Sequence, residues 1–234
     1  MDRRDFLANA GAWLIGLALA GESFADERRM PKIYLTIDDG PREYMNDILK
    51  TLGKKNKATF FMVGKEMKDA SGFYAACQAL EAGHEIGNHS FSHPEFSKIT
   101  FEEARAEIEK TDELICRAYG EAGREIKRLF RFPYGDVGYL KRKTGGCVEH
   151  GSRDKKDEIA AFLKTMKYKT VFWDVDSQDW LYYSKNRTKE LPEILVNISS
   201  ARSGDIVLMH EIPVTAEHLI PYIVSSGRYL SVSI

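Results

Sequence analysis

The chain has 234 residues, of which 43% are hydrophobic, 29% charged and 11% aromatic, which is typical of a globular protein and unlike a disordered chain. Its 34 Lys and Arg residues nearly balance its 35 Asp and Glu residues, so it lacks the basic excess of nucleic-acid-binding proteins and we expect no nucleic-acid partner. The cysteines Cys77, Cys116 and Cys147 are too few and too scattered for a disulfide framework or a cysteine-based zinc site.

The first 25 residues are typical of an export signal. Arg3 and Arg4 precede a short apolar run over residues 10–20, and small residues follow it as at a signal-peptide cleavage site. The run is shorter than the roughly 20 apolar residues that span a membrane. Residues 3–7 (RRDFL) resemble the twin-arginine signal, which implies the twin-arginine export machinery as a partner and a periplasmic or extracellular location in a bacterium. An uncleaved, membrane-tethered form and an amphipathic helix packed on the domain are the alternatives.

From residue 31 onward, short β-rich runs alternate with longer helical patterns, which favours a parallel α/β fold. The expected strands are Ile33–Ile37, Ala58–Val63, His84–Asn88, Leu129–Phe132, Thr170–Val175, Ile206–Met209 and Tyr229–Val232. The expected helices are Glu43–Leu52, Glu66–Ala82, Phe101–Tyr119, Lys156–Met166, Leu191–Ala201 and Thr215–Ser226.

This alternation predicts one domain over residues 31–234 that forms a small, incomplete (β/α) barrel with about seven parallel strands. An open doubly wound sheet is the alternative topology. Thr100 followed by Glu103 predicts a capping box at the start of the helix Phe101–Tyr119. The stretch Gly135–Asp154, rich in Gly, Lys and Arg, interrupts the alternation and is expected to be a surface loop.

Chemically active side chains stand at or just after the ends of five expected strands: Asp38 and Asp39, His89 and His93, Arg131, Asp179 and Trp180, and His210. In a parallel α/β fold the carboxyl ends of the strands gather on one face, where ligands bind. The sequence therefore predicts that these distant residues converge on one pocket.

Two of these groups indicate a metal site. The adjacent carboxylates Asp38 and Asp39 would repel each other in a dry pocket unless a cation lies nearby. His89 and His93 have a His-x3-His spacing that suits a divalent ion, and Pro94 disfavours helix at His93, so we expect the pair at a turn or at a helix end. Taken singly, an Asp-Gly turn and a pair of surface histidines remain alternatives. With Asp39 the histidines supply two nitrogens and one oxygen, a set that suits catalytic Zn²⁺ and also fits iron, Co²⁺ or Ni²⁺.

Five short motifs, in order, resemble the signatures of the polysaccharide deacetylases, the NodB-homology family or carbohydrate esterase family 4. They are residues 36–41 (TIDDGP), 89–94 (HSFSHP), 131–135 (RFPYG), 176–180 (DSQDW) and 208–210 (LMH). The resemblance covers about residues 31–234 and implies a deformed (β/α) barrel of the NodB type with fewer than eight strands. Phe132 stands where the family often has proline, and Ile37 where it often has phenylalanine.

The resemblance also implies roles for individual residues. Asp39, His89 and His93 would hold the metal, Asp38 would be the general base paired with Arg131, and His210 would be the acid oriented by Asp179. The backbone N–H of Tyr134 would stabilise the oxyanion, and Trp180 and Leu208 would enclose the acetyl methyl group.

We therefore expect a metal-dependent hydrolase that removes N-acetyl groups from an acetylated glycan such as peptidoglycan or chitin-like N-acetylglucosamine. An O-acetyl ester hydrolase and a non-catalytic glycan- or metal-binding protein are the alternatives. Lys141, Arg142 and Lys143 would either contact an anionic polymer or form part of a solvated loop.

Overall fold

A curved parallel sheet forms the centre of the computed structural model, which describes residues 30–143, 147–183 and 189–234. Within these ranges its strands are β1 (Lys32–Gly40), β2 (Thr59–Met62), β3 (Glu85–Asn88), β4 (Leu129–Phe130), β7 (Lys169–Thr170), β8 (Val175–Asp176), β9 (Ile206–His210) and β10 (Leu230–Val232). Seven of them follow the order β7-β4-β3-β2-β1-β9-β8, and β10 pairs with the first residues of β1. This parallel half-barrel confirms the incomplete barrel expected from the sequence.

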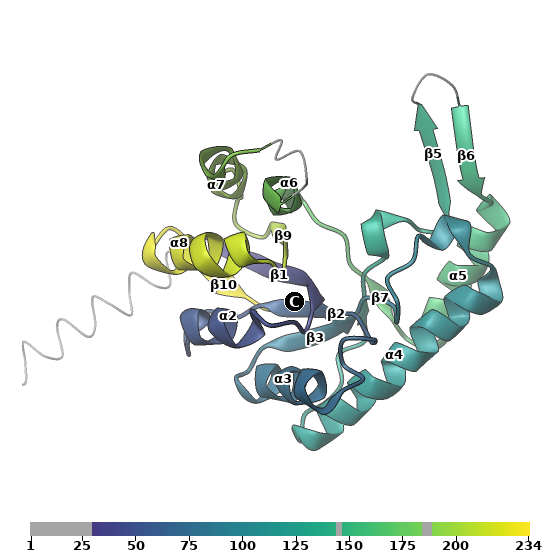
Figure 1. The fold of residues 1–234 in the computed structure, drawn as a ribbon, viewed down its shortest axis with the longest axis horizontal. Coiled ribbons are helices and arrows are strands. Elements are labelled where there is room, and N and C mark those ends of the chain that lie inside the picture. The colour runs from purple at the N-terminus through teal and green to yellow at the C-terminus, as the bar shows by residue number, and fades with distance from the viewer. Residues whose placement is uncertain (1–29, 144–146, 184–188) are drawn as a thin grey trace, which may run out of the picture.

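The helices lie mainly outside the curved sheet, as Figure 1 shows. They are α2 (Met45–Leu52), α3 (Ala70–Glu81), α4 (Phe101–Glu121), α5 (Arg153–Thr165), α6 (Asp179–Tyr183), α7 (Leu191–Ser199) and α8 (Ile220–Ser225). The predicted capping box of α4 is confirmed, because Thr100 Oγ1 accepts from the Glu103 N–H and the Glu103 carboxylate accepts from the Thr100 N–H. The expected helix at Thr215–Ser226 is a π-helical turn, Thr215–Leu219, followed by α8.

The central strand β1 separates the hydrophobic core from the polar interior of the half-barrel. Successive side chains of a strand point to opposite faces, so Ile33, Leu35 and Ile37 are buried in the main apolar cluster. Thr36 and Asp38 face the other way, toward the concave side. Because Asp38 pairs in register with His210 on β9, residues far apart in the sequence meet at this end of the sheet.

The expected strand Thr170–Val175 is wrong as one continuous element, since it consists of the two short strands β7 and β8. Arg131 explains the break. Its Nε donates to the carbonyl of Val171 at 3.3 Å and its Nη2 to that of Phe172 at 3.2 Å. These carbonyls bind a buried guanidinium instead of a neighbouring strand, so the ladder ends there.

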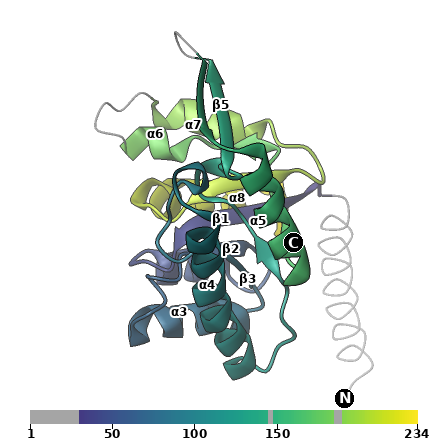
Figure 2. The ribbon, with the colours of Figure 1, turned by 90° about the vertical axis from the view of Figure 1, so that its right-hand side faces the viewer.

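The expected surface loop at Gly135–Asp154 is also wrong over most of its length. It contains an antiparallel hairpin of β5 (Tyr139–Lys143) and β6 (Cys147–Gly151), in which Tyr139 pairs with Gly151 and Lys143 with Cys147. Figures 1 and 2 show the hairpin projecting from the body of the fold, away from the main sheet. An isolated ribbon of this kind needs no continuous apolar run, which is why its charged sequence suggested a loop.

The expected export signal over residues 1–25 lies outside the described residues. Among the residues that are described, no helix has the length and apolar character needed to cross a membrane.

Candidate metal centre and active site

The turn after β1 presents two adjacent carboxylates in different directions. Asp38 keeps the strand alternation and is 3% exposed, whereas Asp39 has a φ of 73°, in the left-handed region. Gly40 follows, and a Cβ atom at that position would lie 2.2 Å from Glu211 Oε2. A side chain at position 40 would therefore displace the Glu211 carboxylate, so glycine leaves room here for the buried Glu211 side chain.

The histidine pair lies on a second tight turn, directly after β3. Ser90 and His93 have φ values of 66° and 61°, so the segment is a turn rather than a helix, in agreement with the expectation from Pro94. The Ser90 N–H donates to Asn88 Oδ1 at 2.9 Å, and the His93 N–H donates to Ser90 Oγ at 3.1 Å. These bonds let two non-glycine residues adopt a conformation that costs about 1–3 kcal/mol each.

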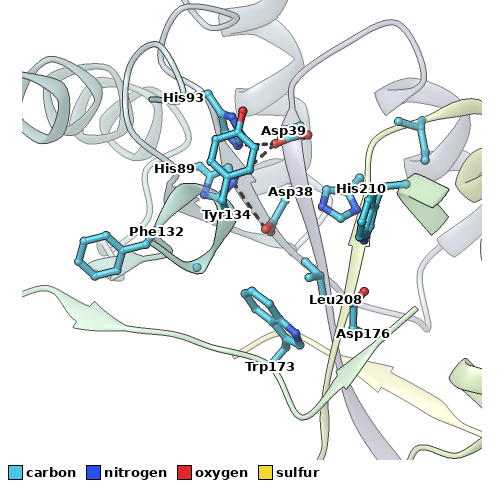
Figure 3. Close-up of a pocket in the computed structure, with 13 residues that line it drawn as sticks. Asp38, Asp39, His89, His93, Phe132, Tyr134, Trp173, Asp176, Leu208 and His210 are labelled. Atoms are coloured by element: carbon cyan, nitrogen blue, oxygen red, sulfur yellow. Dashed lines mark ion pairs between the residues drawn. The ribbon is translucent and has the colours of Figure 1, made fainter. Parts of the chain in front are cut away.

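The two turns bring together the three residues expected to hold a metal. Figure 3 shows the side chains of Asp39, His89 and His93 gathered on one side of the pocket. One possible ligand atom from each of the three residues lies within 4.8 Å of the others. Asp39 Oδ1 is 3.5 Å from His89 Nε2 and 3.1 Å from His93 Nε2. This oxygen is buried and has no hydrogen-bond partner among the described residues. Such an oxygen is costly unless a cation binds it, so the set fits a divalent ion with nitrogen and oxygen ligands.

The protonation states also suit an ion. His89 Nδ1 lies 2.8 Å from the Arg131 carbonyl oxygen. A carbonyl only accepts, so Nδ1 carries the proton and the lone pair of neutral His89 lies on Nε2, toward Asp39. Burial opposes ionisation of Asp39. In the metal-free protein, hydrogen bonds and positive charge from the imidazoles of His89 and His93, which require a proton on the nitrogen that faces Asp39, outweigh burial and hold the pKa of this carboxyl well below its usual range. A bound cation would take the place of these protons.

Asp38 is held by a buried arginine. Arg131 Nη1 donates to Asp38 Oδ1 at 2.8 Å and to Thr36 Oγ1 at 2.8 Å. The other oxygen of Asp38, Oδ2, lies 3.6 Å from His89 Nε2. One oxygen is thus fixed by Arg131, while the second is directed at the candidate metal centre.

His210 and Asp179 form a second polar pair on the opposite side of the pocket. Asp179 Oδ1 lies 2.7 Å from His210 Nδ1, and its Oδ2 accepts from the His210 N–H and from Thr215 Oγ1, each at 2.7 Å. Burial opposes charge on His210, but Asp179, followed by Asp38 and Asp39, raises the pKa of His210 to about 9. An imidazole with its Nδ1 engaged in this way presents Nε2 as a proton donor at neutral pH.

A cavity of about 410 Å³ joins these groups, and it is also lined by Tyr134, Trp180 and Leu208. Of these, Leu208 is 4% exposed and Trp180 is 49% exposed. Tyr134 has a φ of 58°, and its ring lies 4.6 Å from the ring of His93. Arg131 and Asp179 support the cavity from behind, so the structure brings together every site residue expected from the sequence.

Several residues near the cavity had no role expected from the sequence. Trp173 and Asp176 line its inner part, where burial raises the pKa of Asp176. Asp176 lies in the DSQDW motif, so the motif was the available signal. Glu211, next to His210, is 1% exposed, and its Oε1 accepts from the Arg42 N–H at 2.7 Å. Phe132, where the family often has proline, packs against Phe130 with ring centroids 4.8 Å apart.

The fold and the site define an α/β half-barrel with a candidate metal centre at the carboxyl ends of its strands. Residues 25–153 match the family model described as polysaccharide deacetylase. The chain therefore belongs to the polysaccharide deacetylase family.

Named relatives refine this assignment. The chain is 32% identical over 184 residues to the peptidoglycan-N-acetylmuramic acid deacetylase PdaC of Bacillus subtilis, covering 77% of this chain and 32% of that protein. It is 28% identical over 204 residues to the chitooligosaccharide deacetylase of Azorhizobium caulinodans, covering 83% of this chain and 80% of that one. A family 4 carbohydrate esterase from Streptomyces lividans, solved in complex with acetate, superposes with a TM-score of 0.64 at 25% identity, covering 86% of this chain and 91% of that one. The chain thus spans about a third of PdaC and most of the other two.

Proposed function

We propose that this protein is a metal-dependent hydrolase that removes N-acetyl groups from a glycan outside the cytoplasm, with N-acetylglucosamine of peptidoglycan or of a chitin-like oligomer as its substrate. The observation that carries the proposal is the placement of Asp38 between the candidate ligands and Arg131. Holding a metal requires only Asp39, His89 and His93. Hydrolysis of an amide requires in addition a base and a separate acid. Asp38 and His210 would supply them in the same cavity.

In this mechanism a bound divalent ion, Zn²⁺ with Co²⁺ or Ni²⁺ as alternatives, would polarise the amide carbonyl and make water acidic enough to react near neutral pH. Asp39, His89 and His93 would hold it. Asp38, oriented by Arg131, accepts a proton from the attacking water. The Tyr134 backbone N–H donates to the oxygen that becomes negative in the transition state.

The amine leaves only when it gains a proton, and His210 Nε2 supplies it while Asp179 holds Nδ1. The C–N bond breaks, and the products are acetate and the free amino sugar. The polymer is too large for the cavity and stays at its mouth, so the acetyl methyl group points inward, toward Leu208 and Trp180. These two side chains would limit the length of the acyl group.

The test is release of acetate from N-acetylated chito-oligosaccharides and from peptidoglycan by the zinc-loaded protein. We expect Asp38→Asn to lower kcat by about 10²–10⁴-fold, with Zn²⁺ binding retained. The exposed Asp157→Asn on α5 is the matched control and should behave as wild type. Removing the metal with a chelator should abolish activity, and Zn²⁺ should restore it. A wild-type protein that is as inactive as Asp38→Asn on all amide and ester substrates would refute the proposal and favour a binding protein.

The alternative function is hydrolysis of an O-acetyl ester instead of an N-acetyl amide. The dependence of the rate on His210 distinguishes these two reactions. An ester alkoxide leaves more readily than an amine, so an esterase depends weakly on its acid. We expect His210→Asn to reduce amide hydrolysis by about 10²–10⁴-fold. If His210→Asn hydrolyses the best substrate of the wild type as fast as the wild type does, the protein is an esterase.

The proposed location rests on the twin-arginine-like residues 3–7 and on relatives named for peptidoglycan and chitooligosaccharide. Fractionation of bacteria that express the full chain tests it. We expect the protein outside the cytoplasm, and the double variant Arg3→Lys and Arg4→Lys should be retained inside. Retention of both proteins would contradict the proposal.

A further inference from the structure

Glu107, on α4 and outside the cavity, binds the turn that carries the two histidines. Its Oε2 accepts from the Phe91 N–H at 2.9 Å and from the Ser92 N–H at 2.6 Å. Its Oε1 accepts from Ser92 Oγ at 2.8 Å. A single carboxylate thus binds two successive backbone N–H groups and a hydroxyl in the middle of the turn between His89 and His93.

The turn needs this support because of its backbone conformation. Ser90 and His93 both have positive φ, and the bonds from the Ser90 and His93 N–H groups are local ones, to Asn88 and Ser90. The two N–H groups between them, of Phe91 and Ser92, converge as in the anion-binding turns of backbone nests. Glu107 satisfies both from outside the turn, so it opposes relaxation of the strained residues.

Helix α4 is itself fixed relative to β3, from which the turn emerges. Asn88 Nδ2, at the end of β3, donates to the Ile108 carbonyl at 2.9 Å, one residue after Glu107. On the far side of the turn, the Gly64 N–H donates to the Ser90 carbonyl at 2.9 Å and the Lys65 N–H to the Phe91 carbonyl at 2.8 Å. The turn is therefore held between the start of the β2–α3 connection and α4. On the α4 side Glu107 binds its backbone, and Lys110 Nζ lies 5.5 Å from the centroid of the Phe91 ring.

We propose that Glu107 is a positioning residue that sets the metal affinity of this site by fixing the distance and direction of His93 relative to His89 and Asp39. The inference rests on the metal site of the proposed function. The hydrogen bonds of Glu107 go to Phe91 and Ser92 and not to the three candidate ligands, so it acts on these ligands through the turn. Outer partners that orient metal ligands typically contribute 10–100-fold to metal affinity.

The experiment measures the Zn²⁺ affinity of the full chain, without substrate, by competition with a chromophoric chelator. We expect Glu107→Ala to raise the Kd for Zn²⁺ by about 10–100-fold. Glu107→Gln keeps an acceptor oxygen for the turn and should recover part of the loss. Glu113→Ala, an exposed glutamate on the same helix, is the matched control and should bind Zn²⁺ as the wild type does.

Two further measurements distinguish a role of Glu107 in metal affinity from a role in folding alone. At saturating Zn²⁺ the kcat of Glu107→Ala should return to within a few-fold of the wild type, because the ligands themselves are intact. Circular dichroism of the apo-proteins checks the fold, and if Glu107→Ala does not fold, Glu107→Gln carries the test with an expected increase in Kd of several-fold. An unchanged Kd in the folded variant, or a loss of kcat that Zn²⁺ does not restore, would overturn the inference. A wild type that binds Zn²⁺ but releases no acetate would refute the proposed function and leave the affinity comparison intact.

Discussion

Arg131 and Asp38 form an ion pair inside the half-barrel, 2.8 Å apart, with the arginine side chain fully buried. The guanidinium also lies over the ring of Phe61, 4.2 Å from its centroid. The Thr36 hydroxyl both donates and accepts in this network. It donates to the Val207 carbonyl at 2.7 Å, and its oxygen accepts from Arg131 Nη1. The network thus connects β1, which carries Thr36 and Asp38, to Val207 on β9 and to the segment that follows β4, which carries Arg131.

Removing one partner of this pair should cost far more than removing both. Breaking a buried ion pair leaves an uncompensated charge and typically costs about 3–5 kcal/mol, so we expect Arg131→Met to lower the free energy of unfolding by that amount. The double variant Arg131→Met with Asp38→Asn should recover much of the loss. Urea denaturation of the two single variants and the double variant measures the coupling. A loss below about 1 kcal/mol for Arg131→Met, the range of exposed pairs, would contradict a buried, dry ion pair.

The His210–Asp179 pair predicts the alkaline limb of the pH–rate profile. With the pKa of His210 raised to about 9, the acid stays protonated at neutral pH, and a bound cation lowers this value by repulsion. Asp179→Asn removes the charge that raises it, so the alkaline limb of kcat should move down by about 1–3 pH units. NMR titration of the His210 ring in the metal-free protein provides a second measurement, and an unchanged titration would exclude Asp179 as the cause.

The same raised pKa has a stability consequence with a definite sign. The unfolded histidine titrates near 6.5, so the stabilisation from protonated His210 is fully present below about pH 6.5 and is lost as pH rises through about 9. Wild type and Asp179→Asn should therefore differ in unfolding free energy more at pH 6 than at pH 10.

Much of the half-barrel could be predicted because its central strands are apolar runs between amphipathic helices. The position of the candidate site could also be predicted, because Asp38, His89 and His210 each stand at a strand end and parallel strands align those ends. The split between β7 and β8 could not be predicted, because it depends on Arg131, distant in sequence, taking the carbonyls of Val171 and Phe172. Period-2 patterns report burial and carry no information on such long-range hydrogen bonds.

The roles of Glu107 and Glu211 could not be predicted from the sequence for a similar reason. Glu107 looks like one of several acidic residues on an amphipathic helix, and only the fold shows that it faces the histidine turn. Glu211 follows directly after His210 and, as a charged residue, is expected at the surface, yet it is 1% exposed. Its burial depends on the space above Gly40, which the local sequence does not encode.

Glu211 should make the protein less stable as pH rises from acid to neutral. Burial raises the pKa of Glu211 to about 7, against 4.5 for an unperturbed glutamate, although the Arg42 N–H partly opposes the shift. Between these values the folded state binds more protons than the unfolded state, so the unfolding free energy falls with pH, by on the order of 3 kcal/mol in total. Glu211→Gln keeps an acceptor for the Arg42 N–H and should remove this part of the pH dependence.

Urea denaturation at pH 4.5 and pH 7.5 measures the difference between wild type and Glu211→Gln, since the other titrating groups contribute to both. The exposed Glu158→Gln on α5 is the control and should follow the wild type. Parallel pH dependences for wild type and Glu211→Gln would show that folding does not raise the pKa of Glu211.

Leu208 should set the length of the acyl group that is removed in the proposed reaction. It is buried on β9, on the same concave face as His210, and lines the cavity with Trp180. One methylene in such a pocket is worth about 1–3 kcal/mol, so the wild type should prefer N-acetyl over N-propionyl chito-oligosaccharides by about 10–200-fold in kcat/KM. Leu208→Ala makes room for the extra carbon, and the preference should fall below about tenfold.

The control for this change is Leu163→Ala, which removes the same atoms from a different apolar cluster, under α5. Both variants should lose about 2–5 kcal/mol of unfolding free energy, as buried leucines do. Only Leu208→Ala should alter the ratio of the two kcat/KM values, because only Leu208 contacts the cavity. If the ratio changes equally in both variants, or in neither, the acyl group does not lie against Leu208 and the orientation proposed for the substrate is wrong.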